Sequence, residues 1–300
     1  MTMPIGRHVS KLSGYAPSLP TPFGKDGNID RDAFERLCAF QVAEGATALI
    51  VASTTGEDWS LLPHEHTDLV RIAVSTARGV PVIAGANSNA TESATTLAKA
   101  AESAGADAVI SVVPYYNKPT QLGILAHFQA LAASTGLPLI LSDNPSRCVS
   151  RLSDETVVRL AAEPQFIGLE DCTGDLTRPH RLKSIIGERF RVFCGDDAYA
   201  LPYLVSGGDG CLSVVSNVVP GFCRNMFLAY KQGHINRAQR IAAQIVDLTA
   251  AVCGDAHPAN LKYALSLLEF SSPCIRPPLV EPKTASKAQI ERIMRGIDDR

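Results

Sequence analysis

The stretch FIGLEDCTGD, residues 166–175, begins like a buried strand and ends like a polar turn. Its first four residues are apolar or small, as a strand covered on both faces requires. Residues 173–175 are Thr, Gly and Asp, which are typical of turns. Glu170 stands between the two parts, at the last position before the chain leaves the apolar run. The question is what an acid does at the end of such a strand.

Similar apolar runs recur along the chain, and helical patterns separate them. Each run is four to eight residues long and almost continuously hydrophobic, which is typical of strands buried on both faces. The eight runs are residues 15–19, 48–53, 80–86, 107–113, 137–143, 166–170, 191–195 and 210–216.

The intervening segments carry helix signals. Residues 30–45 place apolar side chains at helical spacing and end at Gly45, and residues 91–105 do the same. Residues 153–164 open with Ser153 as a predicted N-cap. Eight strand–helix units predict an α/β fold of the (β/α)8 barrel type. A doubly wound sheet is the alternative, although fewer strands are usual there.

After residue 220 the apolar runs stop and helical patterns continue. Residues 221–233, 235–254 and 259–270 have this character. We expect one barrel over residues 1–222 and a C-terminal helical extension over residues 223–300, packed together as a single structural unit.

Composition restricts the function classes. The 300 residues are 46% hydrophobic and 19% charged with a net charge of −2, and no long basic run points to nucleic acid or an anionic membrane surface. No apolar run approaches the roughly 18–20 residues of a membrane span, and residues 1–15 lack the apolar stretch of a secretory signal. The eight cysteines are scattered without a C-x-x-C pair, which predicts reduced core residues in a cytoplasmic protein.

Functional groups of such a barrel come from the carboxyl ends of the strands. Thr54 and Thr55 can offer hydroxyl and backbone N–H groups to a carboxylate or phosphate, although a capped turn would use the same residues. Tyr116, in VPYYNKP, can relay a proton or simply cover the barrel mouth. Arg147 can clamp a carboxylate, although arginines commonly form surface ion pairs.

These segments occur together and in order in the dihydrodipicolinate synthase/N-acetylneuraminate lyase family of class I pyruvate aldolases, which the chain resembles over nearly its whole length. The similar motifs are TPF, TTGE, PVIAGANSNATESA, VPYYNKPTQLGILAHF, NPSR, TGDL, GDDAYALP and GCLSVVSNVVP. The resemblance is closest to the dihydrodipicolinate synthase branch. It implies a (β/α)8 lyase barrel with C-terminal helices, no cofactor, and a homotetramer built as a dimer of dimers.

The resemblance also assigns residues, and two of them depart from the family pattern. The Schiff-base lysine stands in a pattern like G-[I/L]-K-[E/D]-x-[S/T]-G, and here that position is Glu170 within GLEDCTG. The family's proton-relaying tyrosine at the end of the fifth strand is replaced by Ser142.

The remaining family positions are retained. The resemblance implies that Thr54, Thr55, Arg147 and Leu212 bind a small carboxylate-containing molecule, and that Tyr116 reaches across the tight dimer into the neighbouring site.

An imine needs an amine nucleophile, so a carboxylate cannot replace the lysine. Lys118 is the one lysine near the end of a strand, and the family carries a basic residue there without using it for imine formation. We therefore expect no Schiff base with pyruvate.

Three interpretations of Glu170 follow. In the first, Glu170 pairs internally, for example with Arg147, in a non-catalytic protein that binds a ligand or has no ligand at all. In the second, Glu170 is a general acid–base in an altered lyase that retains Tyr116 and Thr54 as a proton relay. In the third, carboxylates such as Asp143 and Asp171 join it around Mg²⁺ or Mn²⁺. Strand alternation argues against the third, because neighbours of inward-facing residues point outward, and no metal ligand is assigned.

Overall fold

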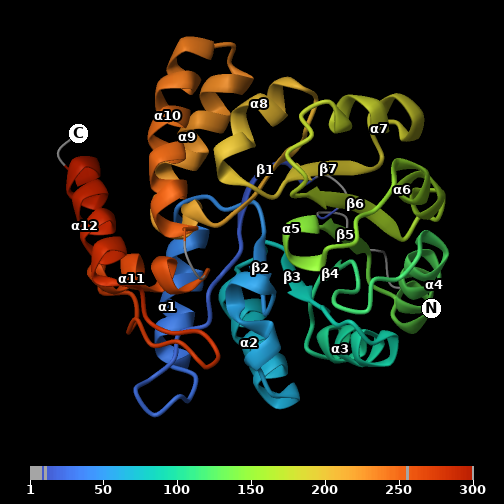
Figure 1. The fold of residues 1–300 in the computed structure, drawn as a ribbon, viewed down its shortest axis with the longest axis horizontal. Coiled ribbons are helices and arrows are strands. Elements are labelled where there is room, and N and C mark those ends of the chain that lie inside the picture. Colours follow the sequence, from blue (N-terminus) through green and yellow to red (C-terminus); the bar gives the residue numbers. More distant parts are fainter. Residues whose placement is uncertain (1–8, 10–11, 255–256, 299–300) are drawn as a thin grey trace.

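The computed structural model describes residues 9, 12–254 and 257–298, and within them eight parallel strands form one sheet in the order β1-β8-β7-β6-β5-β4-β3-β2 (Figure 1). Helices lie outside the strands, so the predicted (β/α)8 barrel is confirmed. The strands are β1 (Gly14–Pro17), β2 (Leu49–Val51), β3 (Val82–Gly85), β4 (Ala108–Val112), β5 (Leu139–Asp143), β6 (Phe166–Asp171), β7 (Arg191–Cys194) and β8 (Gly210–Ser213).

The sheet closes between its first and last members. β1 pairs with β8 over four residues, whereas β1 and β2 meet through the bridge between Ser18 and Ile50. At this seam the amide of Leu19 donates to the carbonyl oxygen of Ile50 at 2.9 Å. The barrel is therefore closed, with its thinnest pairing between β1 and β2.

Helices follow the strands, and some of them begin at a capping side chain. Ser153 accepts a hydrogen bond from the amide of Thr156, as its predicted N-cap role requires, and Asp30 accepts one from the amide of Ala33. These helices are α1 (Arg31–Ala43), α2 (Pro63–Thr76), α3 (Thr91–Ser103), α4 (Gln121–Ser134), α5 (Pro145–Cys148), α6 (Asp154–Ala161), α7 (Arg178–Ile186), α8 (Ala200–Val205) and α9 (Pro220–Lys231).

Three further helices follow α9 and pack beside the barrel (Figure 1). They are α10 (Ile235–Val252), α11 (Ala259–Leu267) and α12 (Thr284–Asp298). The first two match predicted segments, and α12 extends the helical region beyond them. Because α9 follows β8 and runs to Lys231, we propose that the barrel includes all of α9, with the extension beginning after it rather than after residue 222.

The strands are hydrophobic on both faces because each face is covered. Inside the barrel, Ile50, Ile110, Ile140, Phe193 and Leu212 belong to one buried cluster. A larger cluster fills the space between the strands and the surrounding helices. This two-sided burial explains why the runs in the sequence are continuous rather than alternating.

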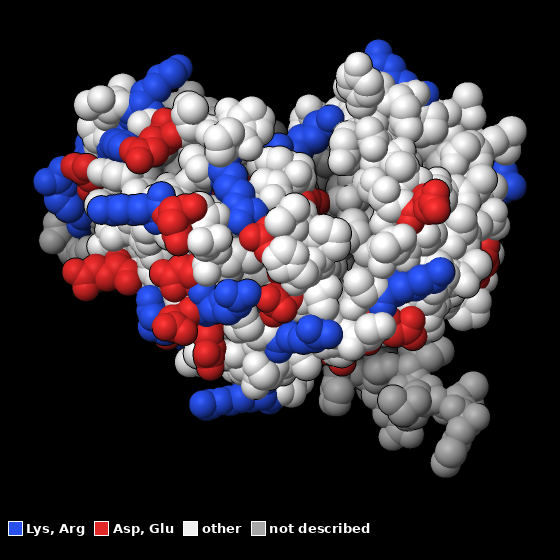
Figure 2. All heavy atoms as spheres, turned by 90° about the horizontal axis from the view of Figure 1, so that it is seen from below, with Lys and Arg blue, Asp and Glu red and all other residues white. Residues whose placement is uncertain are grey.

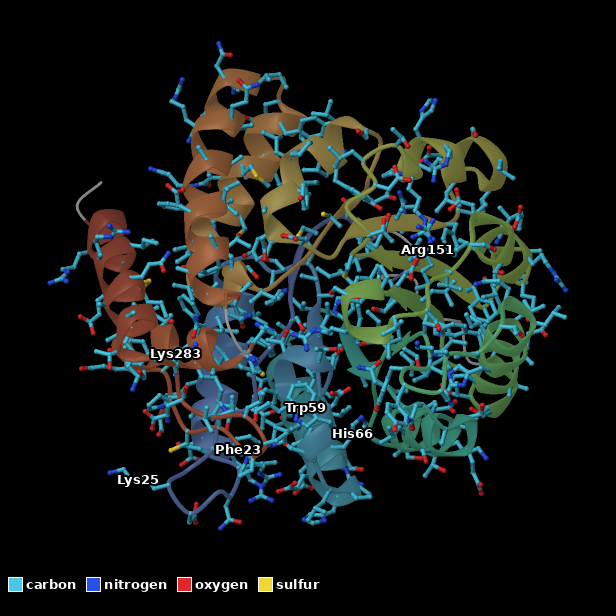
Figure 3. All side chains as sticks on the ribbon, in the orientation of Figure 1. Phe23, Lys25, Trp59, His66, Arg151 and Lys283 are labelled. Atoms are coloured by element: carbon cyan, nitrogen blue, oxygen red, sulfur yellow. The ribbon has the colours of Figure 1, made fainter. Side chains whose placement is uncertain are left out.

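A buried ionic contact ties the C-terminal helices to the barrel. Lys262 on α11 donates to Glu57 at 2.6 Å, and both side chains are almost completely buried. Phe23 lies beneath this pair, with Lys262 Nζ and the Arg276 guanidinium each 4.2 Å from its ring centroid (Figure 3). The C-terminal segment is thus held against the loops at the carboxyl ends of the strands.

The surface fits the expectation from composition. On the face shown in Figure 2, acidic and basic side chains are interspersed without a continuous basic stretch. In the described part of the chain, no helix combines the length and apolar character that a bilayer crossing needs. All eight cysteines are free thiols, and five of them are buried.

Candidate functional site at the carboxyl ends of the strands

A cavity of about 200 Å³ opens at the carboxyl ends of the barrel strands. It brings together six residues that the sequence predicts for the site, namely Thr54, Thr55, Ser142, Arg147, Glu170 and Leu212. The other lining residues are Ser18, Ser53, Asn144, Cys172, Gly195, Asp196, Asp197, Val214, Thr249, Cys253 and His257.

Glu170 and Ser142 are lateral neighbours in the sheet. They face each other in the parallel register of β5 and β6, and both lie in the cavity wall. The Ser142 hydroxyl donates to Glu170 Oε2 at 2.5 Å. The two positions expected to depart from the family pattern are therefore hydrogen-bonded to each other.

The environment of Glu170 favours its neutral form. Burial raises the pKa of its carboxyl to about 7, the nearby Asp171 charge raises it further, and the Ser142 hydrogen bond acts in the opposite direction. A carboxyl with this pKa can exchange protons near neutral pH.

Gly195 allows this arrangement because it has no side chain. A Cβ atom at this position would lie 2.9 Å from Cγ of Glu170 and would also overlap the Cys172 sulfur. The end of β7 can therefore approach Glu170 closely only with glycine there.

Arg147 contributes the positive charge of the cavity. It lies on the short helix α5, is exposed, and has no side-chain hydrogen bond or ion pair to any residue that the structure describes. The expectation that Glu170 pairs with Arg147 is wrong for this structure, because the Glu170 carboxylate is bonded to Ser142 instead. Arg147 is left available for a ligand.

The threonine pair lies in a turn of 3₁₀-helix, Thr54–Gly56, directly after β2. Thr55 Oγ1 is hydrogen-bonded to His257 Nε2 at 3.1 Å. Burial lowers the pKa of His257 to about 3, so its imidazole is neutral at physiological pH. Its other ring nitrogen is buried without a protein partner in the described residues.

Sequence reasoning missed the contribution of the C-terminal helices to the cavity. Thr249 and Cys253 come from the end of α10, and His257 precedes α11. The rule that sites lie at strand ends gives no signal for them. The contact of His257 with Thr55 joins residues 202 positions apart.

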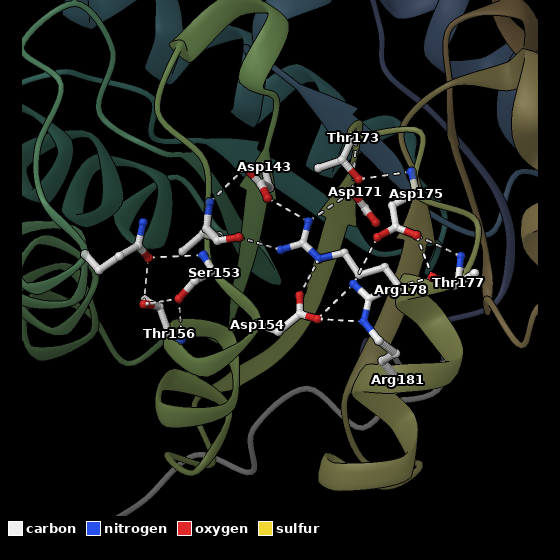
Figure 4. Close-up of polar contacts among 12 residues, drawn as sticks. Asp143, Ser153, Asp154, Thr156, Asp171, Thr173, Asp175, Thr177, Arg178 and Arg181 are labelled. Atoms are coloured by element: carbon white, nitrogen blue, oxygen red, sulfur yellow. Dashed lines mark hydrogen bonds and ion pairs between the residues drawn. The ribbon is translucent and has the colours of Figure 1, made fainter.

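The strand neighbours of Ser142 and Glu170 point away from the cavity. Asp143 and Asp171 both bind the buried guanidinium of Arg178, at 2.6 and 3.1 Å (Figure 4). This confirms the outward orientation expected from strand alternation. These two acids therefore do not join Glu170 in a metal site, and no cluster of three His, Cys, Asp or Glu side chains suited to a metal occurs in the described residues.

The two acids after β7 differ in their surroundings. Asp197 is buried and accepts from the Ser213 hydroxyl at 2.5 Å and from the amides of Val214 and Val215. Asp196 is partly exposed and accepts from the amide of Ala198. Asp197 organises the loop after β8, whereas Asp196 adds negative charge to the cavity.

Tyr116 and Lys118 lie outside the cavity. Both are exposed in the loop after β4, with positive φ angles of 71° and 47°, and Tyr116 is 89% exposed. Among the described residues that line the cavity there is no lysine. Tyr116 thus takes no part in the site of its own chain.

A second cavity of about 260 Å³ adjoins the first and shares Thr54, Asn144 and Arg147 with it. Asp58 lies in its wall, and burial raises the pKa of this carboxyl to about 6. Trp59, next to the start of α2, is 42% exposed beside it (Figure 3).

The closed barrel, the threonine turn and the arginine after β5 define a barrel of the class I aldolase type. The chain belongs to the dihydrodipicolinate synthetase family, which it matches over residues 11–297. It is 45% identical over 285 residues to a 4-hydroxy-tetrahydrodipicolinate synthase of Acidiphilium cryptum, covering 95% of this chain and 98% of that protein. It is 42% identical to the Gluconobacter oxydans protein of the same name, with 96% and 98% covered.

Solved structures agree with this assignment. A dihydrodipicolinate synthase of Bacillus anthracis superposes with a TM-score of 0.92 at 34% identity, covering 94% of this chain and 97% of that one. The Acinetobacter baumannii synthase, solved in complex with pyruvate, gives a TM-score of 0.91 at 32% identity, with 94% and 98% covered.

Proposed function

We propose that this protein binds a small carboxylate-containing molecule in the barrel-mouth cavity and does not form a Schiff base with pyruvate. The observation that carries the proposal is Glu170, which stands at the family's lysine position and is hydrogen-bonded to Ser142 at the tyrosine position. The retained threonine pair and the unpaired Arg147 support carboxylate binding, because an arginine fork and adjacent hydroxyls suit that group.

The chemistry of the two substitutions supports the same conclusion. An imine contains a carbon–nitrogen double bond, and a carboxylate has no nitrogen with which to form one with a ketone. Lys118 is exposed outside the cavity lining, and Lys262 is buried against Glu57. A pyruvate carboxylate entering the site would also meet the Glu170 charge, which opposes its binding when that group is ionised.

Borohydride trapping tests this proposal. The protein is incubated with pyruvate and sodium borohydride, and its intact mass is measured. We expect no added mass, while a lysine-bearing synthase treated in parallel gains one reduced pyruvate. A stable adduct on any lysine of this protein would overturn the proposal.

A second candidate is an altered lyase in which Glu170 is a general acid–base. The observation in its favour is the pKa of about 7, which lets the carboxyl both donate and accept a proton at neutral pH. Turnover of any keto acid or aldol with a bell-shaped pH profile that E170Q abolishes would select this candidate over binding alone.

The assembly and location are also proposals. The 89% exposure of Tyr116 supports its insertion into the neighbouring site of a homotetramer, and eight free thiols support a cytoplasmic location. Sedimentation velocity on the wild type and on Y116A tests the first: a tetramer that weakens in the variant supports it, and a monomeric wild type contradicts it.

A further inference from the structure

We propose that the ligand of this cavity is an amino acid, with its protonated amine on Glu170 and its carboxylate on Arg147 and the threonine turn. This inference rests on the proposed function and names the class of ligand. In a lysine-bearing relative, the protein supplies an amine to a carbonyl of the ligand. Here the protein supplies an acid, and an amine on the ligand is the group that complements it.

The charge of the cavity favours a ligand that carries a positive group. Arg147 is the one cationic side chain among the described lining residues, and His257 is neutral at physiological pH. Three carboxyl groups, those of Glu170, Asp196 and Asp197, line the same space. A keto acid brings only negative charge into these surroundings, whereas an amino acid brings both signs.

The hydrogen bonding of Glu170 leaves one acceptor open. Its Oε2 atom accepts from the Ser142 hydroxyl, and its Oε1 atom has no donor among the described residues. The Ser142 bond fixes the orientation of the carboxylate within the cavity wall. An ammonium group, which has three donors and no acceptor, fits the free oxygen.

Other residues of the cavity lining complement a carboxylate. Among the described residues, neither the Arg147 guanidinium nor the Thr54 hydroxyl in the same lining has a hydrogen-bonding partner. Thr55 is held in place by His257. A volume of about 200 Å³ lies below the usual range of drug-sized sites, which restricts the ligand to a small molecule.

The experiment compares matched pairs on the unmodified protein by isothermal titration calorimetry at pH 8. One panel contains the proteinogenic amino acids in both enantiomeric forms, and the other contains the corresponding 2-keto acids. We expect at least one amino acid to bind, and its keto acid to bind at least about 30-fold more weakly. The keto acid lacks the ammonium group, so its contact with the Glu170 carboxylate is lost.

The variant E170Q keeps the shape of the side chain and removes its charge, so we expect it to weaken the amino acid about 30-fold. The control E188Q makes the same change at an exposed glutamate outside the cavity lining and leaves binding unchanged. Circular dichroism and melting curves show whether each variant is folded, and the matched-pair comparison needs no variant.

The outcomes separate the two proposals. If keto acids bind and amino acids do not, the amino acid inference is overturned while the carboxylate-binding function stands. If neither panel binds, both are overturned. If the amino acid binds equally well to E170Q, the ammonium does not lie on Glu170 and the inference fails.

Discussion

Two neighbouring pairs on β5 and β6 face opposite sides of the barrel wall and have opposite surroundings. Ser142 and Glu170 are in register and point into the cavity, and Asp143 and Asp171 are in register one residue later and point outward. Asp143 and Asp171 are buried, and Glu170 is half-buried. The two pairs differ in how completely their carboxyl groups are satisfied.

On the outer face every carboxylate oxygen has a donor. Asp143 accepts from Arg178 and from the amide of Leu152. Asp171 accepts from Arg178 (Figure 4) and from the amide of Thr173. It also accepts from the Tyr203 hydroxyl.

On the inner face the Glu170 carboxylate has one donor and no cation among the residues that the structure describes. The outer acids, which stabilise the fold, thus have a donor on every oxygen. Glu170 in the cavity keeps one oxygen that can accept a hydrogen bond from a ligand. Four predictions test this difference, in order of decreasing effect.

The largest effect is expected for R178M. Removing the guanidinium leaves Asp143 and Asp171 buried without their cation, and breaking a buried pair from one side costs about 3–5 kcal/mol. The free energy of unfolding in urea measures this loss. An R178M protein as stable as the wild type would show that the outer acids are neutral or solvated.

The second prediction concerns pH and E170Q. The pKa of Glu170 rises from its ordinary value of 4.5 to about 7, so between these values the folded state holds a proton that the unfolded state has lost. Its contribution to stability is therefore present at low pH and is lost as pH rises from about 4.5 to about 7.

Relative to E170Q, the wild type should lose up to about 3 kcal/mol of unfolding free energy across that window. Taking the difference between the two proteins removes the effect of other groups, such as Asp58, that titrate in the same range. A difference that is constant between pH 4.5 and pH 8 would contradict the raised pKa.

The third prediction is a smaller change at Ser142. S142A removes the one donor to Glu170, which raises the pKa of that carboxyl further and costs about 1–2 kcal/mol above pH 7, where the acid is ionised. Below pH 5 the cost should shrink. Denaturant unfolding at both pH values measures it, with S184A on the exposed face of α7 as the control.

The smallest effect is expected at the solvent edge of the outer cluster. Arg181 bridges Asp154 and Asp175 with its side chain 43% exposed (Figure 4). Exposed ion pairs of this kind contribute about 1 kcal/mol or less and weaken with salt. R181A should therefore change the melting temperature slightly at low salt and hardly at all in 1 M salt, unlike R178M.

The fold could be predicted from the sequence because its signals are local. Continuous apolar runs and the N-cap residue Ser153 each depend on a few adjacent positions. The cavity residues at strand ends could be predicted for the same reason, since parallel strands deliver Thr54, Ser142 and Glu170 to one rim.

The rest depends on contacts between distant residues. The approach of His257 to Thr55 is set by how α10 and α11 pack on the barrel, which no local pattern encodes. The choice of Ser142 rather than Arg147 as the partner of Glu170 depends on the register of β5 and β6. A local sequence pattern can predict that a strand forms. Which partner its side chains contact depends on how the strands and helices pack in the complete barrel.

The seam between β1 and β2 borders the cavity, so a ligand bound there can affect how easily the two strands separate. Ser18 lies on one side of this seam and Thr54 follows β2 on the other, and both line the cavity. A molecule bound between them would hold β1 and β2 together at the seam with the thinnest strand pairing in the barrel. Occupancy would then slow deuterium exchange at the Leu19 amide, which bonds across the seam. The cavity lining at the β1–β2 seam thus contacts the ligand, and the bound ligand in turn opposes separation of these two strands.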